Sequence, residues 1–292
     1  MPAAKSCLIK KKSMSEYTFS PALTKAALDD YVALFRKSFA ADEKLNKKYL
    51  EWQYVSNPHG KVIGYDAFLG DELAAHYAIV PRRYHVSSQP IDGALSVNTA
   101  THPIHRGHGL FLKLATITYE AAAKHGVRFV TGVANEHSVR GFTRGLGFTL
   151  LGQARLYAGL RAPFRAKNAL GMRPDSDWLD WRLANPSRRY ERLCHSDGSS
   201  TLCTRIRGVN FHIARMDNAV LERSKYLASL PTSRGLKLGF SPVFAQRAPW
   251  ILRLPQTMQP SPWHVIWRTL DSELDPAISW KLSLDGLSMD TF

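Results

Sequence analysis

A loop with two closely spaced glycines is the feature of this sequence that most directly indicates chemistry. The segment Arg106-Gly107-His108-Gly109-Leu110-Phe111 follows an apolar run and leads directly into a helical pattern. Glycine tolerates positive φ and lets backbone amides approach a ligand closely, because it has no Cβ. The N-terminus of a helix also presents backbone N–H groups and the positive end of the helix dipole. The loop therefore predicts a site for an anion such as a phosphate or diphosphate.

The residues on either side of the loop predict the elements that would position it. The apolar run from Ala94 to Ala100 predicts a strand, and an apolar stripe from Phe111 to Ala122 repeats close to the helical period of about 3.6 residues. A second buried strand is expected from Val127 to Val133, followed by a short helix with Asn135 as its N-cap and Gly147 at its end. The predicted order is strand, loop, helix, strand and helix, with the ligand at the first turn.

Three kinds of nucleotide-binding loop contain closely spaced glycines, and two of them do not fit. A phosphate loop of the nucleoside triphosphatase type needs a Gly-Lys-Ser/Thr ending, which is absent, and a dinucleotide-binding fold needs a third glycine where this chain has Leu112. The remaining pattern, Arg/Gln-x-x-Gly-x-Gly/Ala after a strand, is matched at Arg106 and Gly109, whereas Phe111 departs from it at the last position. With Asn135 downstream, the segment resembles the acyl-CoA loop of the Gcn5-related N-acetyltransferase (GNAT) superfamily. The alternative is an ordinary turn of another α/β protein.

The segments before the loop resemble the front half of the same superfamily. Helical spacing is present from Pro21 to Phe39 and a second helix is expected from Ala41 to Trp52, after which Asp66 to Pro81 predict two strands joined by a Gly-Asp turn. The resemblance implies an α/β (α+β) fold, a mixed sheet flanked by helices. Within it, residues 50–58 read Leu-x-Trp-x-Tyr-x-x-Asn-Pro, which is similar to an element of bacterial acyltransferases that modify amino sugars for surface polysaccharides.

A related element recurs at the start of the second half of the chain. Residues 178–186 repeat the Trp and Asn-Pro theme with one residue fewer between Trp and Asn. Strand-like sequence follows at Thr201–Ile206, Asn210–Arg215, Val265–Leu270 and Trp280–Asp285. No second Arg-x-x-Gly-x-Gly loop is present in the sequence, so we expect a degenerate GNAT-like copy that binds no donor of its own. This half could be a structural lid or a dimerisation surface, which would allow a homodimer, or it could hold part of the acceptor.

Length and composition set the expected domain organisation. A chain of 292 residues predicts about two domains, which we place at residues 17–162 for an acyl-CoA-binding GNAT domain and 163–292 for the degenerate copy. Residues 1–16 carry four lysines but no apolar secretory segment, so we expect a disordered basic tail on a cytoplasmic protein. No apolar run approaches the ~20 residues that cross a bilayer, and no membrane span is predicted.

The formal net charge of +15 requires a partner or a role in solvation. Outside the tail the cations occur singly or in pairs such as Arg82-Arg83, and no nucleic-acid-binding motif is recognisable, so no nucleic-acid partner is predicted. Coenzyme A is itself a polyanion, and Lys113, Arg140 and Arg144 could contact its phosphates or could equally form solvated helix faces. Three scattered cysteines and the lack of a metal-binding His or Cys spacing predict reduced thiols and no metal.

Transfer of an acyl group from a thioester to an amine needs a neutral amine, donors for the oxyanion and stabilisation of the departing thiolate. The resemblance to the superfamily implies that backbone amides of the strand before the loop hold the thioester oxygen, which assigns Val97, Asn98 and Thr99 to the donor site. It also implies that the Asn135 side chain contacts the pantetheine arm or a bridging water, while a plain N-cap role for Asn135 stays open.

One departure from the family pattern concerns the general acid. Many members have a Tyr seven residues beyond the Asn, and this chain has Phe142 there, a residue that we still assign to the donor site by position. The acid therefore comes from elsewhere, or the thiolate, with a conjugate-acid pKa of about 8.5, leaves without one. A histidine suits the general base, because an imidazole titrates near neutral pH. His76 and His102 rank ahead of His108 and His137 because of their positions relative to the strands. A hydrogen-bonded structural role is the alternative for each of these histidines.

These expectations combine into one functional prediction. The chain is expected to be an N-acyltransferase that uses acetyl-CoA or another acyl-CoA, with His76, His102 and Asn135 as candidate catalytic residues and Arg106–Phe111 as the donor loop. The preferred acceptor is a small-molecule amine, an amino sugar in nucleotide-linked form. Two alternatives stay open: acetylation of a protein or amino-acid amine, and a non-catalytic sensor of the same fold that binds an acyl-CoA or a nucleotide.

Overall fold

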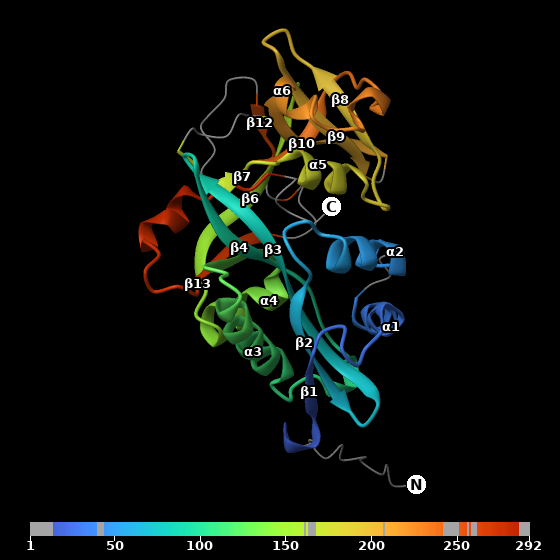
Figure 1. Ribbon diagram of the computed structural model, residues 1–292, viewed down its shortest axis with the longest axis vertical. Helices are drawn as coiled ribbons and strands as arrows, with labels where there is room; N and C mark the ends of the chain where they lie inside the picture. The colour runs from blue at the N-terminus through green and yellow to red at the C-terminus, as the bar shows by residue number, and fades with distance from the viewer. Residues whose placement is uncertain are drawn as a thin grey trace, which may run out of the picture.

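The computed structural model describes residues 14–39, 44–160, 162, 168–206, 208–241, 251–255, 257 and 262–285 (Figure 1). The strands are β1 Thr18–Pro21, β2 Ile63–Leu69, β3 Glu72–Val86, β4 Gln89–Thr101, β5 Phe129–Ala134, β6 Thr149–Gly159, β7 Gly171–Met172, β8 Tyr190–Cys194, β9 Ser199–Ile206, β10 Val209–Asp217, β11 Lys237–Ser241, β12 Ile251–Arg253 and β13 Trp263–Thr269. They pair in the order β1-β2-β3-β4-β5-β13-β6-β11-β10-β9-β8, with β7 beside β3 and β12 beside β6.

Helices connect and cover these strands. The α-helices are α1 Leu28–Ser38, α2 Lys47–Leu50, α3 Leu110–Lys124, α4 Glu136–Arg140, α5 Ser176–Leu183 and α6 Asn218–Leu221. Two π-helical turns, η2 Glu51–Val55 and η4 Gly141–Gly145, extend α2 and α4. Short 3-10 turns are η1 Met14–Glu16, η3 Pro103–His105, η5 Leu227–Ser229 and η7 Pro276–Lys281.

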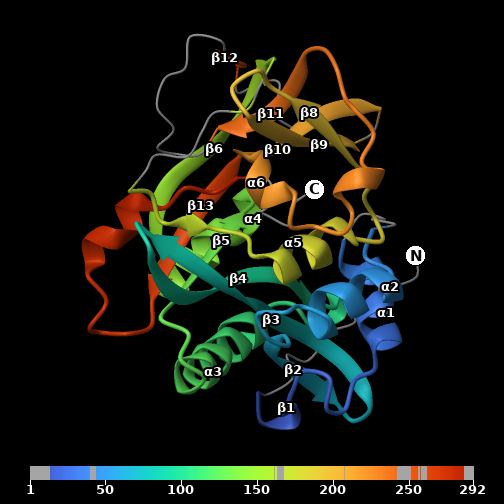
Figure 2. The ribbon, with the colours of Figure 1, turned by 45° about the horizontal axis from the view of Figure 1, so that its top comes forward.

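The sheet of the first half is covered on both faces, because the side chains of β3 alternate between two apolar clusters. Tyr77 and Ile79 pack in the cluster that contains the buried face of α3, whereas Ala78 and Val80 pack in the cluster that contains α1 and the α2 segment. Figures 1 and 2 show α3 on one side of β2–β4, with α1 and α2 on the other side. The predicted mixed sheet flanked by helices is confirmed.

Two predicted helices of the front half begin later than the sequence suggested. Pro21 is the last residue of β1 and is paired in the sheet, so α1 starts only at Leu28. The second helix starts after Asn46, because the Asn46 side chain accepts the N–H of Tyr49 and thereby caps the first turn. Residues 40–43, which include the expected start of this helix, lie outside the described part of the chain.

The two halves of the chain share strands. β6 pairs with β13 through its first residues and with β11 and β12 through its last, so it runs from one sheet into the other. β13 comes late in the sequence, yet it pairs with β5 on its other side and completes the sheet of the first half (Figure 2). The limits 17–162 and 163–292 stay a prediction for the domain boundary, and the hydrogen-bonded strands continue across them.

The strands predicted in the second half are confirmed at three places and wrong at a fourth. β9, β10 and β13 lie where strand-like sequence was found. Trp280–Asp285 does not form a strand, because Pro276–Lys281 form η7 and Asp275 caps this turn by accepting the N–H of Ala277 at 2.9 Å. An aspartate followed by a proline favours the start of a helical turn over an extended strand.

The two repeated tryptophan elements of the sequence lie against each other. The rings of Trp52 in η2 and Trp181 in α5 stack with centroids 4.3 Å apart and planes 7° from parallel. Each indole N–H donates to the backbone carbonyl of the other residue, at 2.7 and 2.8 Å. These reciprocal bonds give the contact an approximate two-fold symmetry and join the front half of the chain to the second half.

Candidate active site

The glycine loop has the backbone conformation that the sequence predicted. Gly107 and Gly109 have φ of +80° and +73°, and Gly109 is the N-cap of α3. A Cβ added to Gly107 would meet nothing within 4 Å, so the space beside it is open, whereas a Cβ on Gly109 would lie 3.2 Å from the methyl group of Met14. Met14 belongs to η1, at the end of the predicted disordered tail, and residues 1–13 lie outside the described residues. The first N–H groups of α3 have no intrahelical acceptors, as at any helix N-terminus.

Side chains around the loop hold its shape. His108 donates through Nδ1 to the carbonyl oxygens of His105 and Arg106, at 3.1 and 3.0 Å. Arg106 donates to the carbonyl oxygen of Ser38 at 3.3 Å and so connects the loop to the end of α1. These two side chains therefore fix the path of the backbone through the loop.

β4 and β5 separate beside the loop. The two parallel strands pair only along Gly93–Leu95, although both continue beyond that point. Further along β4, a bulge opposite β3 places Asn98 in the left-handed region with a φ of +49°, and Val97, Asn98 and Thr99 are half-buried. Backbone polar groups of a strand that has left its neighbour need other partners. A ligand lying between β4 and β5 would supply them.

Asn135 is confirmed as the N-cap of α4. Its Oδ1 accepts the backbone N–H groups of His137 and Ser138 at 3.1 and 3.0 Å. The Asn135 side-chain nitrogen has no hydrogen-bond partner among the described residues. The predicted contact with a pantetheine arm stays a prediction, and it would use this amide nitrogen.

His76 lies in a buried hydrogen-bonded chain. The side chains of His76 and Asp66 are 0% exposed, with His76 Nδ1 2.7 Å from Asp66 Oδ1 and His76 Nε2 2.9 Å from the hydroxyl of Tyr54. Asp66 also accepts the hydroxyl of Tyr31 at 2.7 Å. Burial raises the pKa of Tyr31 and of Tyr54, so both hydroxyls keep their protons. An acceptor amine cannot contact His76 directly in this arrangement.

Sequence reasoning missed Asp66, Tyr31 and Tyr54. The available signal was a carboxylate in β2, a strand of otherwise largely apolar residues, because a buried charge requires a partner. In the sheet, Asp66 and His76 are directly paired across β2 and β3. This pairing depends on the register of the hairpin, which the sequence pattern of either strand alone does not give.

A second cluster of titratable groups is formed by Glu72, His102 and His105. Their possible ligand atoms all lie within 4.8 Å of one another, and the Glu72 carboxylate is 3.6 Å from His105 Nε2 and 4.0 Å from His102 Nε2. Such residues can bind a divalent metal. However, His102 Nδ1 accepts the N–H of Ile104 at 3.3 Å, which places the proton of the neutral ring on Nε2, the atom that would have to bind the metal. This tautomer fits a cluster in which both histidines face the Glu72 carboxylate better than a metal centre.

Phe142, at the position of the family Tyr, is buried in the apolar cluster that includes α3. It is 4% exposed, and its ring packs edge-on against Phe111 and Phe148 with centroids 5.1 Å apart in each case. The Tyr77 ring centroid is 6.5 Å away, and its hydroxyl is 2.9 Å from Ser96 Oγ. Burial raises the pKa of Tyr77 to about 12, so this hydroxyl is protonated. In this position Phe142 can contribute apolar surface to an acyl-donor site, but it cannot supply a proton.

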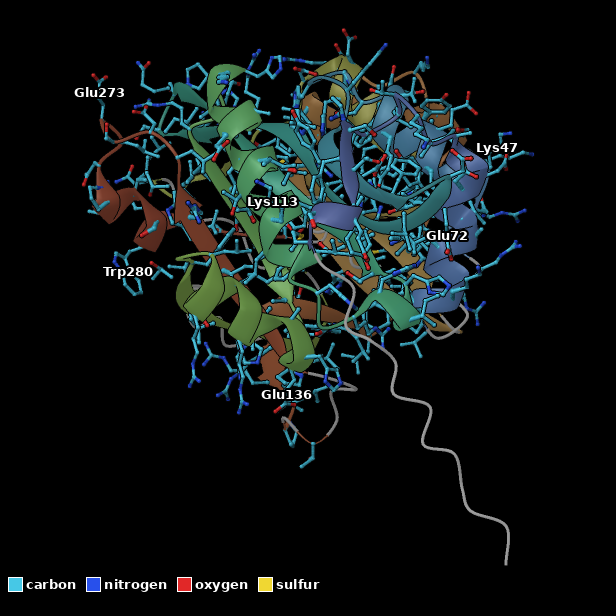
Figure 3. All side chains as sticks on the ribbon, turned by 90° about the horizontal axis from the view of Figure 1, so that it is seen from below. Lys47, Glu72, Lys113, Glu136, Glu273 and Trp280 are labelled. Atoms are coloured by element: carbon cyan, nitrogen blue, oxygen red, sulfur yellow. The ribbon has the colours of Figure 1, made fainter. Side chains whose placement is uncertain are left out.

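The cations suggested for phosphate binding all lie on the surface. Lys113, in the first turn of α3, has its Nζ 6.0 Å from the centre of the Phe19 ring (Figure 3). Arg140 and Arg144 are exposed on α4 and η4. Their positions suit contact with phosphates or with water equally, and both interpretations stay open.

A cavity of about 390 Å³ lies at the opposite end of α3 from the loop. Its lining includes the basic residues His59, Lys61, Arg82, Arg83 and His125. Burial, with Arg82 and Arg83 nearby, lowers the pKa of His59 to about 4. A helix of 15 residues is roughly 22 Å long. The cavity is therefore too distant to share a small ligand with the loop.

This protein is an α/β protein in which two parallel strands separate beside a glycine-opened helix N-terminus, an arrangement that suits a phosphate-bearing ligand. Residues 21–151 match the family model described as "Acetyltransferase (GNAT) domain". This stretch contains the loop, the separated strands and α4. The predicted resemblance to this superfamily is thus supported over residues 21–151, which match a GNAT acetyltransferase domain.

Solved structures share the fold over both halves. A probable N-acyltransferase from Enterococcus faecalis V583, a conserved protein of unknown function, has a TM-score of 0.59 at 12% identity and covers 87% of this chain and 73% of its own. A GCN5-related N-acetyltransferase from Anabaena variabilis ATCC 29413 has a TM-score of 0.57 at 12% identity with the same coverage. A tandem GNAT protein from the clavulanic acid biosynthesis pathway has a TM-score of 0.52 at 12% identity, over 87% of this chain and 98% of that one. At these identities the likeness concerns the fold, and the tandem neighbour agrees with a second GNAT-like half.

No curated protein matches the chain at a significant level. Among the described residues, no helix has both the length and the apolar character that crossing a membrane requires.

Proposed function

We propose that this protein is an N-acyltransferase that uses acetyl-CoA or another acyl-CoA and transfers a short acyl group to a primary amine. The observation that carries the proposal is the pair of left-handed glycines at the N-terminus of α3, beside the point where β4 leaves β5. Backbone N–H groups at such a terminus suit a diphosphate. The GNAT domain at residues 21–151 supports the same chemistry.

The residues of the site divide the requirements of the reaction between them. Backbone amides of Val97, Asn98 and Thr99 in the separated part of β4 would meet the oxyanion that forms on the thioester carbonyl. Of the two candidate bases, the His102 side chain is 12% exposed and could contact the amine, but it can accept a proton only when Nδ1 releases the N–H of Ile104. His76 is fully buried and could act only through Tyr54.

For the acceptor we propose an amino sugar in nucleotide-linked form, which would place the enzyme in polysaccharide biosynthesis in the cytoplasm. The support is the resemblance of residues 50–58 to an element of amino-sugar acyltransferases. In this element Trp52 and Asn57 are buried and bonded to backbone carbonyls, with Asn57 donating to Pro81 at 3.0 Å. Tyr54 of the same element is bonded to Asn98 in β4, and a protein or amino-acid amine stays the alternative acceptor.

Release of free thiol tests the proposed activity. The protein is mixed with acetyl-CoA and, in turn, with glucosamine, a UDP-linked amino sugar, lysine and a lysine-containing peptide. We expect at least one amine to raise thiol release above the rate without amine. Binding of acetyl-CoA without thiol release from any amine would favour the sensor, and absence of acetyl-CoA binding would refute the donor site.

The donor loop is tested separately by Gly109→Glu. The substitution puts a carboxylate where the diphosphate is expected and so should abolish acetyl-CoA binding, because like charges repel at short distance. Isothermal titration calorimetry measures the affinity. A variant that stays folded and binds acetyl-CoA as tightly as the natural protein would refute the loop assignment.

A further inference from the structure

The side-chain amide of Asn98 has a fixed orientation. Its Nδ2 donates to Gln53 Oε1 at 2.6 Å and to the hydroxyl of Tyr54 at 3.1 Å. Both hydrogens of the amide nitrogen are thus bonded inside the protein. No donor among the described residues is bonded to Asn98 Oδ1, which is not one of the buried atoms left without a partner. The carbonyl oxygen of the half-buried Asn98 is therefore accessible and free to accept a hydrogen bond from a ligand.

The hydrogen-bonded chain behind Asn98 has one consistent direction. The Asp66 carboxylate can only accept, so Tyr31 and His76 Nδ1 both donate to it, at 2.7 Å each. With the ring proton on Nδ1, His76 accepts at Nε2 from the hydroxyl of Tyr54, and the Tyr54 oxygen accepts from Asn98. Because each bond determines the next, the buried carboxylate of Asp66 decides which end of the Asn98 amide faces the core.

The location of Asn98 suits the reacting end of the site. It lies in the bulge of β4, beyond the last residue paired with β5, and its side chain points toward η2. The donor loop opens α3, which covers the other face of the sheet. A donor at the loop and an acceptor at Asn98 would thus approach β4 from opposite faces. Left-handed backbone at a non-glycine residue is uncommon and is tolerated best by Asn.

We propose that Asn98 Oδ1 accepts a hydrogen bond from the acceptor amine and directs its lone pair toward the thioester carbon, with Tyr54, His76 and Asp66 as positioning residues. This inference rests on the proposed N-acyltransferase function. In the step, the N–C bond forms, the C–S bond breaks, the amine loses one proton and the carrier leaves as the thiol. An amide oxygen suits this task because it is uncharged, whereas a carboxylate would favour the unreactive ammonium form of the amine.

A pair of Tyr-to-Phe variants tests this assignment. Tyr54→Phe and Tyr31→Phe each remove one hydroxyl from a ring that is 0% exposed, but only Tyr54 is bonded to Asn98. With the most active amine of the panel, Tyr54→Phe should lower kcat/KM for the amine about tenfold through KM and leave the Kd of acetyl-CoA unchanged. Tyr31→Phe should keep kcat/KM within about twofold of the natural protein. Equal losses of kcat/KM in the two variants would overturn the proposal. The hydrogen bonds from Asp66 to Asn98 would then have a structural role only.

A second readout needs no acceptor. In ¹⁵N-labelled protein, both side-chain amide protons of Asn98 should exchange slowly with water, and Tyr54→Phe should release one of them while Tyr31→Phe should not. Fast exchange of both protons in the natural protein would overturn the fixed orientation of Asn98. If no amine of the panel releases thiol, the proposed function fails. The exchange measurement still decides whether the hydrogen bonds through Tyr54 hold the Asn98 amide in place.

Discussion

Replacing Gly107 with alanine isolates the contribution of the loop to donor binding. Gly107 has a φ of +80°, and an added Cβ would have no neighbour within 4 Å. Alanine in this conformation costs about 1–2 kcal/mol of folding free energy. Gly126, past the other end of α3, has a φ of +78° and an equally open Cβ position. Gly126→Ala therefore carries the same backbone strain without facing the loop, which makes it a matched control.

The difference between the two variants should appear in the affinity for acetyl-CoA. If amides beside Gly107 bind the diphosphate, a methyl group there should disrupt one hydrogen bond to a charged group, worth about 1.5–3 kcal/mol. That loss corresponds to a Kd roughly 10- to 150-fold higher, whereas Gly126→Ala should stay within about twofold of the natural protein.

Isothermal titration calorimetry with acetyl-CoA gives the Kd of each variant, and urea unfolding gives its free energy of unfolding. The reasoning requires similar losses of stability and a large difference in Kd between the two variants. A folded Gly107→Ala protein that binds acetyl-CoA as tightly as Gly126→Ala would refute it.

Three further predictions concern stability and the missing acid. Trp52→Phe and Trp181→Phe should each lower the free energy of unfolding in urea by about 2–3 kcal/mol, because each leaves a buried carbonyl without its donor. The double variant should lose less than the sum of the two single losses, and additive losses would contradict a coupled contact. Burial is the main cause that lowers the pKa of His59 to about 4 and of His212 to about 3, so between these values and about 6.5 only the unfolded chain gains these protons. The free energy of unfolding should therefore fall by about 1 kcal/mol per histidine from about pH 7 to 5.5. A free energy of unfolding in urea that does not change over this pH range would contradict buried neutral rings. Phe142→Tyr should lose about 1–3 kcal/mol of stability without faster thiol release, since its hydroxyl would enter an apolar cluster; a higher kcat would show that the site accepts an acid there.

Local patterns determined the conformation of the glycine loop and its supporting elements. The left-handed conformations of Gly107 and Gly109, the N-cap at Asn135 and the span of α3 all follow from chemistry within a few residues of sequence. Turn and cap preferences act through the nearest backbone groups, and helical periodicity is written in one segment. These features could therefore be predicted without knowing where the rest of the chain lies.

The proposed acceptor side of the site was decided only by the tertiary structure. The pairing of His76 with Asp66 depends on the register of β2 on β3, and the bond from Asn98 to Tyr54 joins β4 to η2 across 44 positions of sequence. The insertion of β13 between β5 and β6 likewise joins strands that are far apart in the chain. Strand register and packing are set by contacts between distant residues, and the pattern of one segment contains no information about its partner. The sequence by itself therefore determined the conformation of the proposed donor loop, while folding decided which side chains surround the proposed acceptor position.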